Sequence, residues 1–111
     1  MIETVVLNYL IDNLSVPAFM EVPEDKLQEF VTIEKVGSSK ENHIKRATLA
    51  IRSYGPTLAK AARLNEELKT IIENIIELDS IVKVQLNSDY NNTDTSQKRY
   101  RYQAVFDFVY Y

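Results

Sequence analysis

The chain has 111 residues, of which 45% are hydrophobic and 26% are charged, and it contains no cysteine. These totals are typical of one soluble globular domain, residues 1–111, and they exclude disulfide bonds and thiolate metal sites. The formal net charge of −3 argues against a general nucleic-acid binder. We expect no signal peptide and no membrane partner, because the N-terminus lacks a basic region and no apolar run could span a bilayer.

Charge is divided unevenly along the chain. Residues 1–34 hold seven acidic residues and one basic residue, a net charge of −6, whereas residues 35–111 hold nine acidic and twelve basic residues, a net charge of +3. Such a division suits head-to-tail contact between copies of the chain. Small proteins also show uneven charge by chance, and on this feature alone the second explanation has more weight.

The first part of the chain predicts a helix and a short strand. Apolar residues recur at helical spacing over residues 2–14, and Ser15 and Pro17 end this helix. Residues 18–22 predict a strand, and residues 23–30 predict a turn or a short helical connection.

The next part predicts a hairpin. Residues 30–36 and 47–54 both alternate between apolar and polar side chains, and Gly37 ends the first run. The polar residues 37–46 between them predict a long loop at the hairpin tip.

A long helix follows. The sequence predicts it over residues 56–78, with Pro56 at the first helical position, where its missing N–H is not needed. One apolar stripe continues to Leu78, so the helix would be roughly 34 Å long and could cross a whole sheet.

The last part predicts a second hairpin with a long tip. Its strands are residues 80–86, with Val82, Val84 and Leu86 on one side, and residues 99–110; the tip is the polar loop 87–98. One face of the last strand is almost entirely aromatic, and we expect it to form the core under the long helix. We therefore expect three of its residues to be largely buried against the helix residues Leu68, Ile72 and Ile75: Tyr102, Phe106 and Phe108.

The order of these elements predicts an α+β fold. Helices do not alternate with every strand, so a doubly wound parallel sheet is not expected. We predict a small mixed or antiparallel sheet of four to five strands with two helices packed on one face.

Few residues in the sequence could support catalysis. His43 is the only histidine, and two glycines cannot build a phosphate-binding loop. Acidic and basic residues alternate on the long helix, as on a solvated helix face. We predict that the protein is not an enzyme and needs no catalytic residue, cofactor or metal.

The whole chain resembles one known family in the order of its elements and in several short phrases. These phrases are "EVPEDKLQEFVTIEKVGSSKEN", "ATLAIRSYGPTLAKAARLNEELKTIIENI" and "RYQAVFDF", with Tyr90 and Asp94 in the loop before the last. The chain is similar to the tail terminator (tail completion, head–tail joining) proteins of long-tailed bacteriophages. Members often carry Trp where Tyr54 stands and Gly-Gly where Gly37–Ser38 stands.

The resemblance implies a structural subunit of the virion that closes into a ring, usually a hexamer. Such a ring sits on the head-proximal end of the tail tube and docks to the head connector. Its partners would be other copies of itself, the tail tube protein and the head–tail connector protein, and genomic DNA would pass through its lumen without specific binding. Assembly would take place in the cytoplasm of the bacterial host.

Two groups of residues are candidates for the ring contact or the lumen. The first is the set of charged residues in and beside the two expected loops: Lys40, His43, Lys45, Arg46, Lys98 and Arg99. The second lies on the face of the last strand away from the core: Arg101, Val105, Val109 and Tyr111. Plain solvent exposure is the alternative explanation for the loop charges.

Two other functions fit the same sequence. The chain could be a small cytoplasmic adaptor domain that binds a partner protein. It could also bind single-stranded nucleic acid through Arg99 and Arg101. We expect these two residues and Gln103 to be free for recognition on the outer face of the last strand.

Overall fold

The computed structural model describes residues 1–24, 27–96 and 99–111, and it shows two α-helices, one 3₁₀ helix and five strands in this part of the chain. In chain order these elements are α1 (Ile2–Asn13), β1 (Ala18–Phe19), β2 (Phe30–Glu41), β3 (Ile44–Gly55), α2 (Leu58–Glu73), η1 (Asn74–Glu77), β4 (Ile81–Asn91) and β5 (Tyr100–Tyr110).

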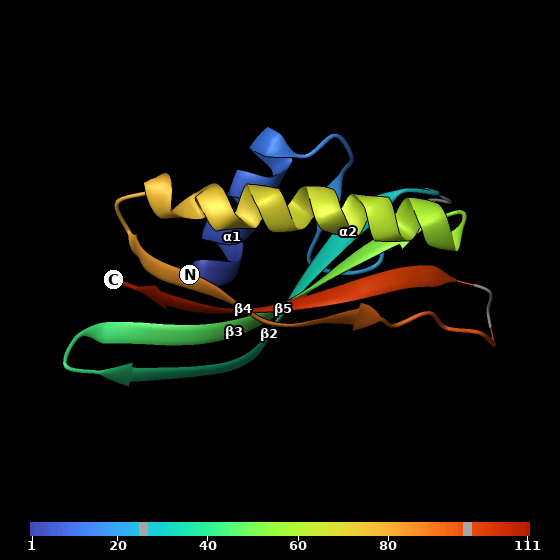
Figure 1. The fold of residues 1–111 in the computed structure, drawn as a ribbon. Coiled ribbons are helices and arrows are strands. Elements are labelled where there is room, and N and C mark those ends of the chain that lie inside the picture. Colours follow the sequence, from blue (N-terminus) through green and yellow to red (C-terminus); the bar gives the residue numbers. More distant parts are fainter. Residues whose placement is uncertain (25–26, 97–98) are drawn as a thin grey trace.

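The strands form one sheet in the order β1-β2-β3-β5-β4. Strand β1 is parallel to β2, and the remaining neighbours are antiparallel. Both α-helices lie on the same side of the sheet, and α2 runs along it (Figure 1). The prediction of an α+β fold with four to five strands and two helices on one face is confirmed.

The core lies between this sheet and the helices. Phe106 and Phe108 are each 1% exposed and belong to the same buried cluster as Leu68, Ile72 and Ile75. The aromatic face of β5 therefore supplies the floor of the core, as its alternation predicts. The three tyrosines of this face lie toward the ends of the strand and are half-buried: Tyr100, Tyr102 and Tyr110. Tyr102 is therefore less buried than expected.

The first hairpin differs from the prediction of a long loop over residues 37–46. Strands β2 and β3 pair as far as Glu41 and Ile44, so the turn is only Asn42 and His43, which have φ values of 51° and 67°. Two consecutive positive φ values are typical of the two-residue type I′ turn, and they match the twist of the flanking strands. The sequence of these strand ends predicts a loop because neither face is covered there: residues 34–41 are all exposed.

The second hairpin also differs from the prediction. Strand β4 continues to Asn91, so residues 87–91 of the expected loop 87–98 belong to the strand. Residues 97–98 lie outside the described part. The register of β4 shifts between Ile81 and Lys83 and again between Leu86 and Ser88. The first shift leaves Val82 without a cross-strand partner, and Val82 and Leu86 are exposed, whereas Val84 packs against the core.

The start and the end of the long helix are also displaced. Thr57 is the N-cap and its hydroxyl accepts a hydrogen bond from the Lys60 N–H at 3.2 Å, so Pro56 precedes the cap instead of opening the helix. Helix α2 ends at Glu73, and η1 takes the chain to Glu77. A Cβ atom on Gly55 would lie 2.8 Å from the Ala61 nitrogen, so only glycine lets α2 cross β3 this closely.

The N-terminal elements agree with the prediction in kind but not in length. Helix α1 ends at Asn13, close to the expected residue, whereas β1 contains only Ala18 and Phe19 of the predicted residues 18–22. The described residues of the segment between β1 and β2 form bends without a regular element.

Candidate functional site

The open face of the sheet, which lies away from the helices α1 and α2, is not covered by either of them (Figure 1), so it could form a binding surface. A row of hydrogen bonds crosses it from β2 to β4. Arg52 donates to Glu34 at 3.0 Å and to Gln103 at 2.7 Å, and Gln103 in turn donates to the hydroxyl of Tyr90 at 2.5 Å. The centre of the open face is therefore a closed polar network that ties four strands together.

A second group of hydrogen bonds lies beside this row and surrounds Asp107. The Thr48 hydroxyl donates to one carboxylate oxygen of Asp107 at 2.6 Å, and the Asn87 side-chain amide donates to the other at 3.0 Å. Both carboxylate oxygens of Asp107 thus have a hydrogen-bond donor.

At one end of the open face, aromatic side chains pack against one another. The rings of Phe30 and Tyr54 stack with centroids 4.4 Å apart, and Phe19 meets Phe30 edge-on at 6.3 Å. The guanidinium of Arg101 lies 6.0 Å from the Tyr54 ring centroid, and its Nε donates to the Asn92 carbonyl at 2.6 Å. Arg101 therefore holds the start of β5 against its neighbours.

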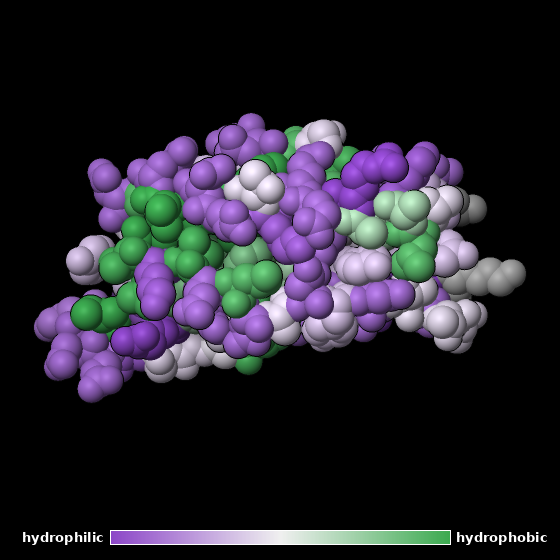
Figure 2. All heavy atoms as spheres, viewed as in Figure 1, coloured by the Kyte–Doolittle hydropathy of each residue, from purple (hydrophilic) through white to green (hydrophobic). Residues whose placement is uncertain are grey.

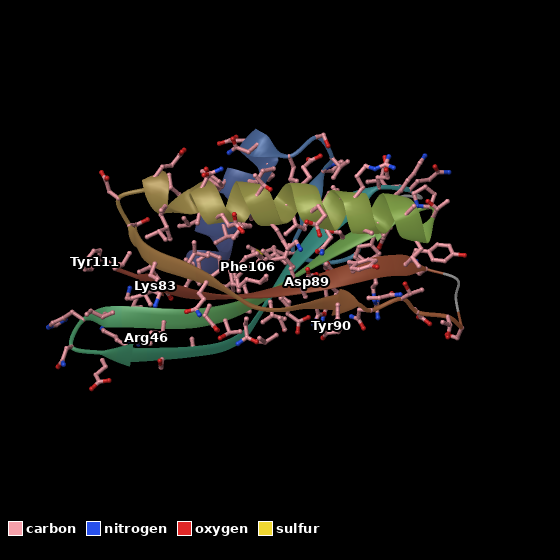
Figure 3. The ribbon with its side chains drawn as sticks, in the orientation of Figure 1. Arg46, Lys83, Asp89, Tyr90, Phe106 and Tyr111 are labelled. Carbon is pink, nitrogen blue, oxygen red and sulfur yellow. The ribbon has the colours of Figure 1, made fainter. Side chains whose placement is uncertain are left out.

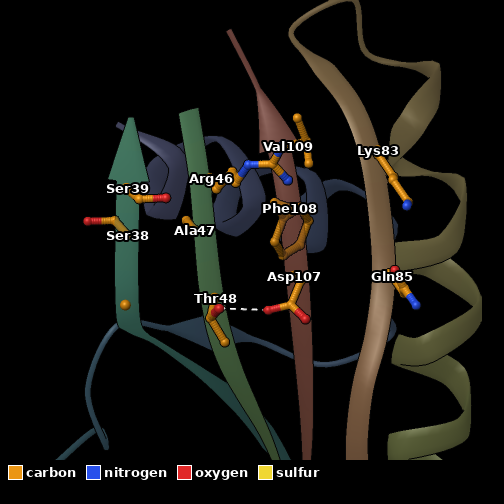
Figure 4. A pocket seen from close by; sticks show the side chains of 11 residues that line it. Ser38, Ser39, Arg46, Ala47, Thr48, Lys83, Gln85, Asp107, Phe108 and Val109 are labelled. Carbon is orange, nitrogen blue, oxygen red and sulfur yellow. Dashed lines mark hydrogen bonds between the residues drawn. The ribbon is translucent and has the colours of Figure 1, made fainter. Parts of the chain in front are cut away.

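The other end of the open face is hollowed by a shallow pocket of about 440 Å³ (Figure 4). Its centre is one cross-strand row, because Ser39 pairs with Arg46, Arg46 with Val109, and Val109 with Lys83. Arg46 and Lys83 are exposed, and neither side chain makes a hydrogen bond or ion pair with any residue that the structure describes. We call these four residues the basic row.

In the basic row the two cations, Arg46 and Lys83, lie on opposite sides of the apolar Val109. Neighbouring strands are about 4.8 Å apart, so the backbones of Arg46 and Lys83, with β5 between them, are roughly 10 Å apart. Figure 3 places both at the same end of the sheet. An acidic ligand with two carboxylates at similar spacing could contact both cations.

A different kind of surface lies beside β4, which is an edge strand of the sheet. Three large apolar side chains in η1 and β4 are exposed here: Ile76 (57%), Val82 (49%) and Leu86 (41%). Apolar residues gather over this region, at the left of Figure 2. We call these three residues the β4 strip.

Strand β4 is fixed to α2 by a polar cluster. Asp89 accepts hydrogen bonds from Asn65 at 2.6 Å and from Lys69 at 2.5 Å, and Lys69 also pairs with Glu66 at 2.8 Å. The hydrogen bond to Asp89, followed by the one to Glu66, raises the pKa of Lys69 above its ordinary value of 10.5. The free edge of β4 is therefore held in a defined position.

The candidate residues from the sequence do not form one site. Lys40 and His43 lie at the hairpin tip, Arg46 and Val109 lie in the basic row, and Lys45 lies 6.0 Å from the Tyr110 ring centroid. The other candidates lie apart from these. Arg99 and Arg101 are at the far end of the sheet, Val105 is half-buried between Ala50 and Ser88, Tyr111 is 69% exposed at the C-terminus, and Lys98 lies outside the described residues.

The expectation that Arg101 and Gln103 are free for recognition is wrong. Gln103 is 8% exposed and lies inside the hydrogen-bond network, and Arg101 is bound to Asn92 and Tyr54. Side chains on the polar face of a strand look free in the sequence, but here their cross-strand neighbours occupy them.

The sequence reasoning missed Lys83. It lies in a strand with no charge pattern around it, and it joins Arg46 only because β5 lies between β3 and β4. A sequence signal would have required the strand order, which the alternation of apolar and polar residues does not supply.

The described residues contain no group of three or more histidine, aspartate or glutamate side chains that could hold a metal ion. No helix among them is long and apolar enough to cross a membrane.

Comparison with known proteins does not assign this chain to a family. Neither the models of known protein families nor the curated proteins contain a match to it.

Proposed function

We propose that this chain is the subunit of a ring, usually a hexamer, that caps the tail tube of a long-tailed bacteriophage and docks to the head connector. The observation that carries the proposal is the β4 strip: three large apolar side chains exposed beside a long free sheet edge. Exposed apolar surface of this kind favours coverage by another protein. The resemblance in the sequence to tail terminator proteins supports another copy of the chain as that protein.

The shape of the sheet supports a head-to-tail contact. A ring needs two different patches on one subunit, because each copy presents one patch to the copy before it and the other to the copy after it. The two edges of this sheet differ strongly. Strand β4 is long, whereas β1 is short and leaves β2 without an outer neighbour beyond residue 32.

The bulges in β4 favour contact through side chains over addition of a strand. They interrupt the regular backbone on both sides of residues 83–86, so an incoming strand would find only a short ladder to pair with. The bulges therefore favour the function of a ring subunit over that of an adaptor that binds an extended peptide.

The hairpin of β2 and β3 is suited to contact with the tail tube or connector. It extends past the helices at one end of the molecule (Figure 1), whose longest dimension is 45 Å against 25 and 23 Å for the others. Its tip carries Lys40 and His43, two of the residues expected to meet the lumen or the tube. In this role the protein is part of the virion and acts without catalysis or cofactor.

The proposal is tested by viewing the purified protein in negative stain and by light scattering, with and without isolated tail tubes. We expect rings, either from the protein alone or on the ends of the tubes. A protein that stays monomeric over a wide range of concentration and salt, and does not bind tubes, would contradict the ring and leave the adaptor function ahead.

A further inference from the structure

We propose that the basic row receives the acidic segment 20–24 of a second copy of this chain. This inference rests on the proposed ring and identifies one of its contacts. It joins two surface features, the cations of the open face and the carboxylates that follow β1, which pair with no residue of the described part of the chain.

The pocket has an excess of positive charge. Arg46 and Lys83 are unpaired with any described residue, and the one carboxylate in the pocket, Asp107, already receives hydrogen bonds from Thr48 and Asn87. Val109 separates the two cations and gives the row an apolar centre. A ligand that fits must be anionic at two points and apolar between them.

The segment after β1 has this pattern. Glu21 and Glu24 are exposed and form no ion pair with any described residue, and the exposed Met20 and Val22 are 42% and 41% accessible. Val22 precedes Pro23, which restricts it to extended or polyproline II backbone. In polyproline II geometry residues three apart lie on the same side with backbones roughly 9 Å apart, close to the roughly 10 Å between the backbones of Arg46 and Lys83.

The segment cannot reach the pocket of its own chain. It lines a different hollow with Leu7, Ala18 and Phe19, and Phe19 pairs with Thr32, which lies roughly 23 Å along β2 from Ser39 of the pocket at ~3.3 Å per residue. The contact must therefore join two copies. It is heterologous, because the two patches are different, and a heterologous contact is what a ring requires.

A second copy fits this pocket better than nucleic acid does. Binding along a phosphate backbone needs a series of cations and a basic domain, whereas this chain has a net charge of −3 and the pocket has two free cations around an apolar centre. Peptide carboxylates flanking an apolar residue match both features.

The test uses two full-length variants with opposite charge reversals. The pocket variant is Arg46→Glu with Lys83→Glu, and the segment variant is Glu21→Lys with Glu24→Lys. Each variant alone places like charges in the contact, so we expect the apparent dissociation constant for self-association to rise by about tenfold or more. An equimolar mixture restores opposite charges at every contact, so we expect it to assemble again.

The matched control is Lys60→Glu with Arg63→Glu, which changes the net charge as much as the pocket variant does but lies on α2. We expect it to assemble like the wild type. Sedimentation measured near 0.15 M salt gives the association state, and circular dichroism checks that every variant is folded. A folded pocket variant that assembles normally, or a mixture that fails to assemble, would overturn the proposed contact and leave the ring itself standing.

A second measurement separates the contact from the ring. A labelled peptide of residues 20–24 is titrated into the wild type and into the pocket variant, and its fluorescence anisotropy is followed. Saturable binding to the wild type alone supports the contact even if no ring forms. No binding at about 1 mM, the order of effective concentration that a tethered neighbour supplies, would overturn the contact.

Discussion

Phe106 shows at the scale of one residue how an aromatic strand can be core and not a binding platform. It is 1% exposed and packs in the cluster with α2 (Figure 3). We predict that Phe106→Ala lowers the free energy of unfolding by about 3–5 kcal/mol, because the lost burial and the remaining cavity add. Urea unfolding of the two proteins measures the difference.

Tyr111 is the control for this change, since it is also aromatic but 69% exposed. Tyr111→Ala should alter the free energy of unfolding by less than about 0.5 kcal/mol. A loss below about 1 kcal/mol for Phe106→Ala would mean that the aromatic face is not the core and would return the nucleic-acid hypothesis to consideration.

Tyr9 makes the stability of the fold depend on pH in the alkaline range. Burial, and then the nearby charge of Glu77, raise the pKa of its hydroxyl above the ordinary value of 10.0. The folded protein holds this proton more tightly than the unfolded chain, so the contribution to stability is complete below pH 10.0 and is lost as the pH rises through the folded-state pKa. The raised pKa of Lys69 acts in the same direction above 10.5.

We therefore predict that Tyr9→Phe unfolds with a weaker pH dependence than the wild type above about pH 10. At neutral pH the variant should lose about 0.5–1.5 kcal/mol, because the hydroxyl donates to the Asn74 carbonyl at 3.2 Å. Urea unfolding at a series of pH values gives both quantities. Equal slopes for the two proteins at alkaline pH would show that another group causes the loss.

The hairpin of β2 and β3 is the element in which structure and sequence expectation differ most. Its turn places Asn42 and His43 at positive φ, which is costly for a residue with a Cβ and free of that cost for glycine. We predict that His43→Gly stabilises the protein by about 0.5–1 kcal/mol. Thermal unfolding and the amide exchange of residues 38–46 measure the effect.

A glycine placed in the adjacent strand should act in the opposite direction. Ser39 pairs with Arg46 in the ladder, and Ser39→Gly should destabilise by about 0.5–1 kcal/mol. If His43→Gly is destabilising as well, residues 42–43 do not form a tight turn.

How far the elements could be predicted depends on whether they bury a face. Helix α2 and strand β5 contribute Leu68, Ile72 and Phe106 to the core, and this burial imposes the periods that the sequence displays. The outer part of β2 buries nothing, so hydrogen bonds with β3 maintain it and its polar residues show no period of two. The basic row could not be predicted at all, because Arg46 and Lys83 become neighbours only through the strand order.

At the scale of the whole molecule, an exposed apolar surface and an exposed basic surface lie on the two sides of the edge strand β4. The β4 strip includes η1 on the helix side, and Lys83 belongs to the open face. A neighbour that covers the edge of β4 would thus meet both surfaces at once. The apolar part would supply most of the affinity, and the charged part would set the orientation and the rate of association.

Leu86 gives the decisive prediction for assembly. It is 41% exposed in the β4 strip, so Leu86→Lys should leave the fold nearly unchanged, with a loss of stability near or below about 1 kcal/mol. In a covered contact the same change buries an unpaired charge, and we predict that rings no longer form alone or on tail tubes.

Ile11→Lys is the matched control, because Ile11 is 52% exposed on α1, away from β4. Light scattering and negative-stain images should show rings for Ile11→Lys and monomers for Leu86→Lys. Rings from a folded Leu86→Lys protein would mean that the β4 strip stays in solvent and that neighbouring subunits meet through another surface.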